Sequence, residues 1–143
     1  MSYIFERDLI KLDLEATNWE DAIVKTCRIL EDKGYINNNF CNRLIEVTKE
    51  IGPYYIITKN IGIPHLRPEE GVLKEGFSLF KFNKKVDFLG NEIEYLIYIL
   101  SLSDENHLEK ISKVADILEN KEFFSKISSE GIDNINILDY INN

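Results

Sequence analysis

The sequence predicts an α/β fold, in which a mixed central β-sheet is flanked by α-helices in a single domain. Three observations support this prediction. Two amphipathic stretches with helical periodicity come first, runs rich in aromatic and β-branched residues follow, and a nearly continuous apolar run then leads into another amphipathic stretch. Helical and strand patterns in this order are typical of a sheet covered by helices. The length of 143 residues fits one domain, residues 1–143.

Two helices are predicted before residue 53. Thr17 followed by Glu20 is a capping-box pattern, and apolar residues then recur at helical intervals until Gly34 supplies a stop signal. The second stretch begins near the asparagines at 37–39, which favour a helix N-cap, and ends at Gly52-Pro53.

Strands are predicted in the middle of the chain, at 54–58, 77–82 and 86–88, because these runs are rich in aromatic and β-branched residues. The run at 95–102 is apolar almost throughout, as in a central strand covered on both faces, although periodicity alone does not exclude a buried helix. A helix is predicted from Asp104 to Leu118, and shorter helices near 123–127 and 135–141.

Composition restricts the class of partner. The chain is 44% hydrophobic and 29% charged, which argues against disorder, and its net charge of −8 disfavours nucleic acid and anionic lipid. No apolar run approaches the ~20 residues that span a bilayer, and residues 1–8 lack the order of a signal peptide. We therefore expect a cytoplasmic protein with no direct membrane insertion. Cys27 and Cys41 lack metal-site spacing and are expected to be free thiols without chemistry.

His65 is the strongest candidate for chemistry. It follows Pro64 and precedes Pro68, and both prolines restrict the backbone, while the flanking Gly62 and Gly71 permit conformations that other residues resist. The pattern predicts a rigidly displayed imidazole. The alternative is an exposed loop in which the histidine has no role.

His107, the other histidine, follows the apolar run in the first turn of the predicted helix. The carboxyl ends of strands in open α/β sheets are where sites gather. A helix N-terminus attracts anions and disfavours extra positive charge, so we expect this ring to be largely neutral near pH 7. The alternative is an ordinary exposed first-turn residue.

Three chemical interpretations of the two histidines were compared. A metal site would need a third ligand at recognisable spacing, and a serine hydrolase would need a G-x-S-x-G elbow, neither of which the chain contains. Neutral imidazole is a competent nucleophile at cellular pH. Histidine phosphorylation therefore fits best, with no metal and no cofactor expected.

The motifs resemble a known family, the enzyme IIA components of the bacterial phosphoenolpyruvate-dependent sugar phosphotransferase system (PTS), in the mannitol/fructose superfamily. The resemblance runs through Gly62 to His65, Gly71, the strand at 77–82, and the apolar run that ends in His107-Leu108. The G-P-Y of residues 52–54 and the P-H-L-R-P-E-E-G-V of 64–72 are most similar to the ascorbate-type branch.

This resemblance implies a cytoplasmic phosphocarrier. His65 would accept a phosphoryl group from the phosphocarrier HPr and pass it to a cysteine of enzyme IIB, with the membrane enzyme IIC involved indirectly and His107 as the second imidazole of the site. The sugar would be L-ascorbate or a related sugar acid or polyol. The alternative functions are a regulatory enzyme IIA-like protein that binds partners according to its phosphorylation, and a binding module that has lost the chemistry.

One departure concerns the cation that supports the phosphoryl group. Mannitol-type members carry an arginine before the loop, where the ungapped counterpart here is Lys49. A lysine does not reproduce the bidentate fork of arginine on a phosphate. Arg67, two residues from His65, is therefore the predicted cation, against the alternative of a solvated surface arginine.

Overall fold

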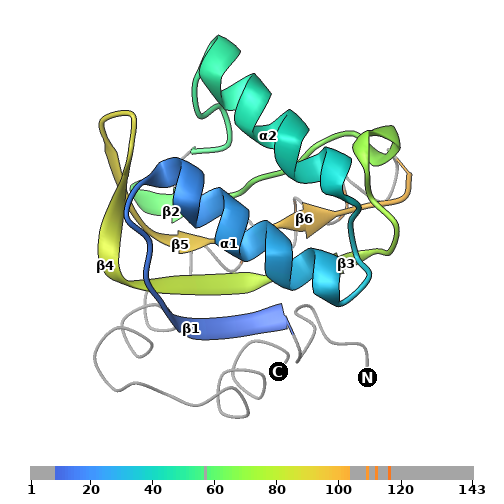
Figure 1. Cartoon of the computed structure of the whole chain (residues 1–143), viewed down its shortest axis with the longest axis horizontal. Helices are drawn as coiled ribbons and strands as arrows, with labels where there is room; N and C mark the ends of the chain where they lie inside the picture. Colours follow the sequence, from blue (N-terminus) through green and yellow to red (C-terminus); the bar gives the residue numbers. More distant parts are fainter. Residues whose placement is uncertain (1–8, 57, 104–108, 110–111, 113–115, 117–143) are drawn as a thin grey trace.

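A four-stranded mixed sheet organises the part of the chain that the computed structural model describes, which is residues 9–56, 58–103, 109, 112 and 116. The strand order is β1-β4-β5-β2 (Figure 1). β4 and β5 are antiparallel, whereas β1 pairs in parallel with β4 and β2 in parallel with β5. The bounds are β1 Ile10–Leu14, β2 Asn60–Gly62, β4 Leu79–Phe88 and β5 Asn91–Leu96. The predicted mixed sheet is confirmed.

β4 and β5 form a hairpin with a two-residue turn. Leu89 and Gly90 both have positive φ, 54° and 101°, between the paired residues Phe88 and Asn91. Turns with two positive φ values match the right-handed twist of the flanking strands. The Gly90 amide also donates to Asp87 Oδ1 at 3.0 Å, which closes the turn.

The predicted strand at 95–102 is wrong as a single element. It is divided between β5 and β6 (Ile99–Leu100), and β6 pairs with β3 (Gly76–Phe77) in a separate two-stranded sheet. The backbone changes partner after Ile97: the Ile97 amide still donates to the Gly62 carbonyl of β2 at 2.9 Å, whereas the Tyr98 carbonyl accepts from the Ser78 amide at 3.2 Å, beside β3. A run that is buried on all sides carries no periodicity to mark such a change.

The predicted strand at 54–58 is also wrong. Residues 54 and 55 form a turn, and Thr58 makes only an isolated bridge to Ile61. Tyr55 is fully buried, and its hydroxyl lies 3.0 Å from Thr48 Oγ1. Its aromatic character therefore reflects packing against a helix and not pairing in a sheet. β1, which the sequence analysis missed, alternates between apolar and polar residues.

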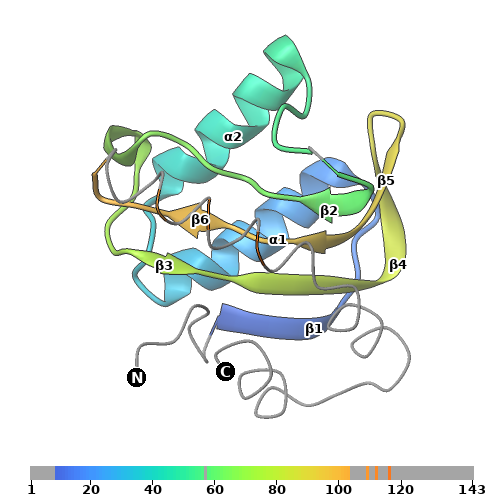
Figure 2. The same ribbon diagram turned by 180° about the vertical axis from the view of Figure 1, so that it is seen from behind.

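Two helices cover one face of the sheet, α1 (Trp19–Asp32) and α2 (Asn38–Ile51), as Figures 1 and 2 show from opposite sides. The N-cap of α1 is Asn18, one residue after the predicted Thr17: its Oδ1 accepts from the Asp21 amide at 2.8 Å, and Asp21 Oδ2 accepts from the Thr17 amide at 3.0 Å. The exchange is similar to a capping box, but the second bond goes to the residue before the N-cap. Gly34, at φ 81°, follows the helix as predicted.

The core lies between these helices and the sheet. Its largest fully buried side chains are aromatic, and Tyr98 connects the layers because its hydroxyl lies 2.7 Å from Thr26 Oγ1 of α1. Cys27 is buried in this core and Cys41 is half-buried, and both are free thiols. No helix within the described ranges is long and apolar enough to cross a membrane. The helices predicted after residue 103 lie outside the residues described as continuous structure.

Candidate functional site

His65 lies in the loop between β2 and a single 3₁₀ turn, η2 (Pro68–Glu70). The ring is half-buried, and its Nδ1 is 2.7 Å from the carbonyl oxygen of Ile63. Because a carbonyl oxygen only accepts hydrogen bonds, Nδ1 of the neutral ring must carry the proton, which leaves the lone pair on Nε2. The loop therefore selects one tautomer with its own backbone.

Backbone hydrogen bonds hold the segment before His65 from two directions. The Ile63 amide donates to the Tyr55 carbonyl at 2.9 Å, and the Ile99 amide donates to the Pro64 carbonyl at 3.1 Å. The segment is thus fixed between the turn after α2 and the run that leads into β6. These hydrogen bonds restrict the backbone before His65, in addition to the restriction that the prolines impose.

The start of α2 holds the other end of the loop. The Asn37 amide donates to the Gly71 carbonyl at 3.0 Å, and Asn39 Nδ2 donates to the Glu70 carbonyl at 3.1 Å. Gly71 has φ 127°, and a Cβ there would lie 2.5 Å from Asn37 Oδ1 and 2.9 Å from the Phe40 nitrogen. Only glycine fits this close approach to the helix.

Tyr54 contacts His65 at two places. Its hydroxyl donates to the His65 carbonyl oxygen, and its ring meets the imidazole edge-on, with centroids 5.3 Å apart and an interplanar angle of 82°. Burial raises the pKa of Tyr54 to about 12, so the hydroxyl keeps its proton throughout the physiological range.

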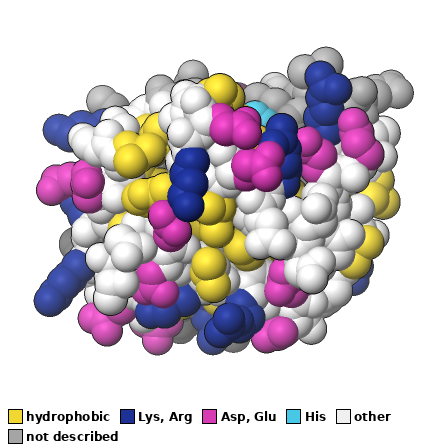
Figure 3. All heavy atoms as spheres, turned by 45° about the horizontal axis from the view of Figure 1, so that its top comes forward, with side chains coloured by type: hydrophobic (Ala, Val, Ile, Leu, Met, Phe, Trp, Pro, Cys, Tyr) yellow, Lys and Arg dark blue, Asp and Glu magenta, His cyan; other side chains and the backbone are white. Residues whose placement is uncertain are grey.

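A surface depression of about 250 Å³ brings His65 and Arg67 together. Residues of α2 form one wall and the loop forms the other. The lining consists of Arg43, Val47, Ile51, Tyr54, His65, Leu66, Arg67, Pro68 and Glu70. Figure 3 shows a histidine side chain reaching the surface among basic and acidic side chains. The site is therefore open to solvent, and it has both apolar and charged walls.

Arg43 is the lining residue that the sequence analysis missed. Its Nε is 3.2 Å from Glu70 Oε1, and its Nη1 pairs with Glu46. The spacing of Arg43, Val47 and Ile51, four residues apart in one helix, places all three on the same face. That spacing could have indicated Arg43 once the loop was known to lie against this face of α2.

Lys49 is not part of the depression. Its Nζ lies 3.7 Å from Glu20 Oε1 of α1, and both side chains are largely exposed. His107 lies outside the described residues, so its predicted place beside His65 stays a prediction. Within the described ranges, no group of three or more histidine, cysteine or acidic side chains could hold a metal ion.

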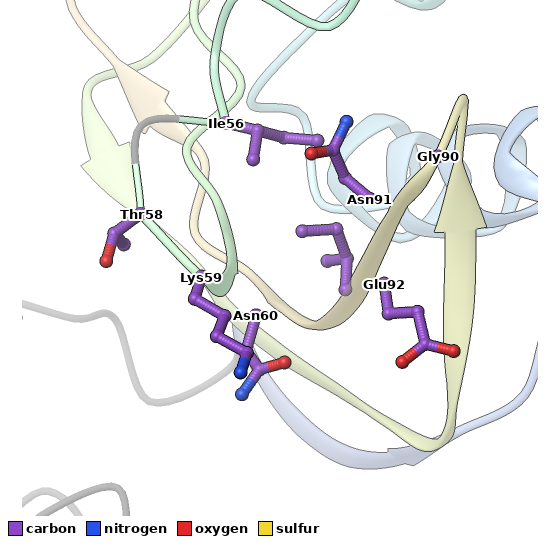
Figure 4. A pocket seen from close by; sticks show the side chains of 8 residues that line it. Ile56, Thr58, Lys59, Asn60, Gly90, Asn91 and Glu92 are labelled. Atoms are coloured by element: carbon purple, nitrogen blue, oxygen red, sulfur yellow. The ribbon is translucent and has the colours of Figure 1, made fainter.

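A larger hollow of about 570 Å³ lies by the β4–β5 turn and the segment that leads into β2 (Figure 4). Its lining residues are Ile56, Thr58, Lys59, Asn60, Gly90, Asn91, Glu92 and Ile93. They include none of the predicted site residues, and no histidine or cysteine. The smaller depression, which contains His65, is therefore the candidate site.

Comparison with known proteins decides the family. The family model of the phosphoenolpyruvate-dependent sugar phosphotransferase system, EIIA 2, matches residues 3–143. The chain belongs to this family. As an enzyme IIA component of the PTS it is a phosphotransferase, with the role of a sugar-specific phosphocarrier.

Curated relatives of this enzyme IIA differ in their sugar. The mannitol-specific cryptic phosphotransferase enzyme IIA component of Escherichia coli (strain K12) is 32% identical over 129 residues, 89% of this chain and 88% of the relative. The ascorbate-specific PTS EIIA component of the same strain is 28% identical over 126 residues, 85% of this chain and 82% of the relative. These values do not separate the two sugar types.

Solved structures share the fold. PtxA, a PTS IIA protein of Streptococcus mutans, matches with a TM-score of 0.87 and 27% identity, covering 96% of this chain and 88% of that one. A complex of the mannitol enzyme IIA with phosphorylated enzyme IIB from E. coli matches with a TM-score of 0.75 and 19% identity, covering 95% of this chain and 97% of the other. The α/β fold predicted from the sequence is confirmed.

Proposed function

We propose that this enzyme IIA accepts a phosphoryl group from phospho-HPr on Nε2 of His65 and passes it to a cysteine of enzyme IIB during sugar uptake. The observation that carries the proposal is the hydrogen bond between Nδ1 and the Ile63 carbonyl, in a loop that opens onto the surface depression. In the neutral ring, this bond fixes the tautomer that has its lone pair on Nε2, as a nucleophile requires.

In each step of the transfer, one bond to phosphorus forms as another breaks. The Nε2 lone pair attacks the phosphorus of phospho-HPr, and the nitrogen–phosphorus bond of the donor breaks as the new one forms. The ring becomes cationic while it keeps the Nδ1 proton, and the Ile63 carbonyl stabilises that charge. In the second step a cysteine thiolate of enzyme IIB attacks the same phosphorus, and the bond to Nε2 breaks.

Two arginines stabilise the phosphoryl oxygens in this proposal. Arg67 and Arg43 both line the depression with His65. Phosphoryl transfer requires mainly positioning and charge stabilisation, which a guanidinium provides through its fork of donors. Glu70 and Glu46 hold Arg43 in the resting state, so phosphorylation adds a competing anion for the same cation. His107 is proposed as the second imidazole of this site.

Donor and acceptor are other proteins, and the surface suits brief contacts with them. Ile51 and Tyr54 line the depression with exposed fractions of 69% and 36%. Apolar side chains at an open site favour protein association. A complex of this kind, between enzyme IIA and phosphorylated enzyme IIB, is known for the mannitol proteins of E. coli. We place the chain in the cytoplasm with these partners.

For the sugar, we propose the L-ascorbate type. The support is the P-H-L-R-P-E-E-G-V run at 64–72, most of which the structure places around the depression. Enzyme IIA does not touch the sugar in this scheme, so the test is phosphoryl transfer to enzyme IIB proteins of the two sugar types. Phosphoryl flow to an ascorbate-type enzyme IIB and not to a mannitol-type one is expected, and the reverse result would reject the assignment.

The central experiment incubates the protein with phosphoenolpyruvate, enzyme I and HPr, and measures its mass before and after acid treatment. We expect one acid-labile phosphoryl group on the wild type and none on His65→Ala. A phosphorylated His65→Ala variant would contradict the proposal. His107→Ala should still accept the group but transfer it poorly to enzyme IIB, and an unchanged transfer rate would reject the role of His107.

Matched substitutions separate the arginines from general charge effects. Arg67→Ala and Arg43→Ala should each slow acceptance roughly tenfold, because each removes one charge-assisted contact with the phosphoryl group. Lys49→Ala removes an exposed cation outside the depression and should leave the rate unchanged. Equal slowing in all three variants would show that only net charge matters.

A further inference from the structure

We propose that Tyr54 is a positioning residue that sets the orientation and the tautomer of the His65 imidazole. The inference rests on the proposed function, since the ring that it orients is the proposed phosphoryl acceptor. Tyr54 contacts both ends of His65: its hydroxyl bonds the backbone carbonyl and its ring packs edge-on against the imidazole.

The two contacts act on different torsions. The hydroxyl fixes the peptide plane after His65, and the ring limits rotation of the imidazole about its side-chain bonds. A further restraint is the bond from Nδ1 to the Ile63 carbonyl at 2.7 Å. That bond needs the imidazole and the backbone of residue 63 to keep their relative positions, so a freer His65 would lose part of it.

Tyr54 is itself held firmly. It follows Gly52, at φ 87°, and Pro53 in a tight turn at the end of α2, where the Ile56 amide donates to the Pro53 carbonyl at 3.1 Å. Its ring also packs edge-on against buried Tyr55, with centroids 5.2 Å apart. Proline limits the backbone of this turn, so the position of Tyr54 depends on where α2 ends. Through its two contacts, Tyr54 in turn limits the position of His65.

A role in positioning also explains why the residue is a tyrosine. Phenylalanine would keep the ring contact but would leave the His65 carbonyl without the phenol donor. Leucine would remove both contacts. The phenol keeps its proton up to high pH because burial raises the pKa of Tyr54 to about 12, so the hydroxyl donates throughout the range in which the protein works.

The experiment compares Tyr54→Phe and Tyr54→Leu with the matched control Tyr55→Phe. The control removes a phenol hydroxyl from the neighbouring residue, where it lies 3.0 Å from Thr48 Oγ1 and does not bond His65. Imidazole ¹⁵N chemical shifts, measured without any phosphoryl donor, report the tautomer of His65. Rates of phosphoryl acceptance from phospho-HPr give kcat and KM.

We expect Tyr54→Phe to lower the fraction of the Nδ1–H tautomer and to reduce kcat roughly three- to tenfold, the range for one lost hydrogen bond, with KM nearly unchanged. Tyr54→Leu should lower both the tautomer fraction and kcat further. Tyr55→Phe should lower thermal stability through the loss of its contact with Thr48, and it should leave the ¹⁵N shifts of His65 as in the wild type.

Unchanged ¹⁵N shifts and unchanged kcat in both Tyr54 variants would overturn the proposal. Shifts in Tyr55→Phe as large as those in Tyr54→Phe would also overturn it, because the effect would then be general loosening of the turn. If the wild type accepts no phosphoryl group, the proposed function fails, while the ¹⁵N shifts of the variants still test whether Tyr54 positions the ring.

Discussion

Cys27 and Cys41 are the same residue type, yet their surroundings shift their acidities in opposite directions. The interaction between the two thiols is the leading cause of both shifts: it raises the pKa of Cys27 well above the usual range and lowers the pKa of Cys41. Burial of Cys27 adds to its shift. A thiol that keeps its proton stabilises a neighbouring thiolate, so the two groups shift in opposite directions. The two side chains come from different helices, so the sequence spacing did not indicate this contact.

We predict that Cys41 is alkylated faster than Cys27 in the folded protein. The lowered pKa of Cys41 gives more thiolate at a given pH, and its side chain is only half-buried. Iodoacetamide labelling followed by peptide mass analysis across a pH series is the measurement. In Cys27→Ala the midpoint of Cys41 labelling should move to higher pH. A midpoint that does not move in this variant would contradict the assigned interaction.

At the candidate site, sequence patterns located His65 and Arg67, because prolines, glycines and the chemistry of imidazole are local features. Arg43 was missed because its nearness to the loop depends on how α2 packs, which no local pattern contains. The carbonyl of Ile63 was also missed as the partner of Nδ1, since it is a backbone atom whose orientation only the folded loop defines.

Among the elements, α2 contributes most to the site. One of its faces is buried against the core through Phe40, Leu44 and Thr48, while Arg43 and Ile51 face the depression. Its first residues hold the end of the loop, and its last residue leads into the turn that contains Tyr54. The helix therefore connects the packing of the core to the placement of His65.

The start of α1 allows a prediction about pH and stability. The hydrogen bond from the Thr17 amide is the leading cause that lowers the pKa of Asp21 from 3.8. Because the folded-state pKa lies below the unfolded one, this carboxylate stabilises the fold above about pH 4, and the contribution is lost as the pH falls through the folded-state value. Asp21→Asn should therefore lower the free energy of unfolding at pH 7 by about 0.5 kcal/mol, a small effect because the side chain is partly exposed.

Urea denaturation at pH 7 and at pH 2.5 provides the measurement for Asp21→Asn, and the difference from the wild type should shrink at the lower pH. Asp32→Asn is the matched control. Asp32 is an exposed residue at the other end of the same helix, where a negative charge is unfavourable, so its removal should not destabilise the protein. A loss of stability for Asp21→Asn that is equal at both pH values would contradict the assignment.

The two helices before residue 53 were predicted to within a few residues, and the strands in the described part of the chain less well. Helix ends carry local signals such as the asparagine caps and Gly34, whereas a strand is defined by a distant partner. The run at 95–102 changes partner half-way, and the aromatic pair at 54–55 packs in a turn. The alternation of β1 was visible in the sequence, but the short segment was overlooked.

At the scale of the whole molecule, the site lies at the surface and meets the core at Leu66. The depression lies between α2 and the loop, whereas the four-stranded sheet packs beneath both helices. Side chains such as Phe80, Phe82 and Tyr98 are fully buried and close the interior. A phosphoryl group on His65 would thus add charge at the surface without entering the packed layers.

We therefore predict that phosphorylation changes amide NMR resonances in residues 52–71, in 97–99 and on the α2 face around Arg43, and leaves β1 and the β4–β5 turn nearly unchanged. The physical reason is that surface charge is screened over about 10 Å, while the close-packed core does not rearrange. Proton–nitrogen correlation spectra before and after phosphoryl transfer are the measurement. His65→Ala in the same mixture should show no changes, and broad changes across β1 and β4 would contradict the prediction.

The attachment of the His65 loop to both ends of α2 has a consequence for the speed of exchange between partners. The fourteen residues of α2 form a helix about 21 Å long. This helix connects Asn37, which bonds the Gly71 carbonyl, to the turn that contains Tyr54, which bonds the His65 carbonyl. A visiting protein meets a surface that already has its final shape, so encounter requires little ordering of the chain. Such complexes can be specific and still dissociate quickly, which is what the proposed transfer from one partner protein to another needs.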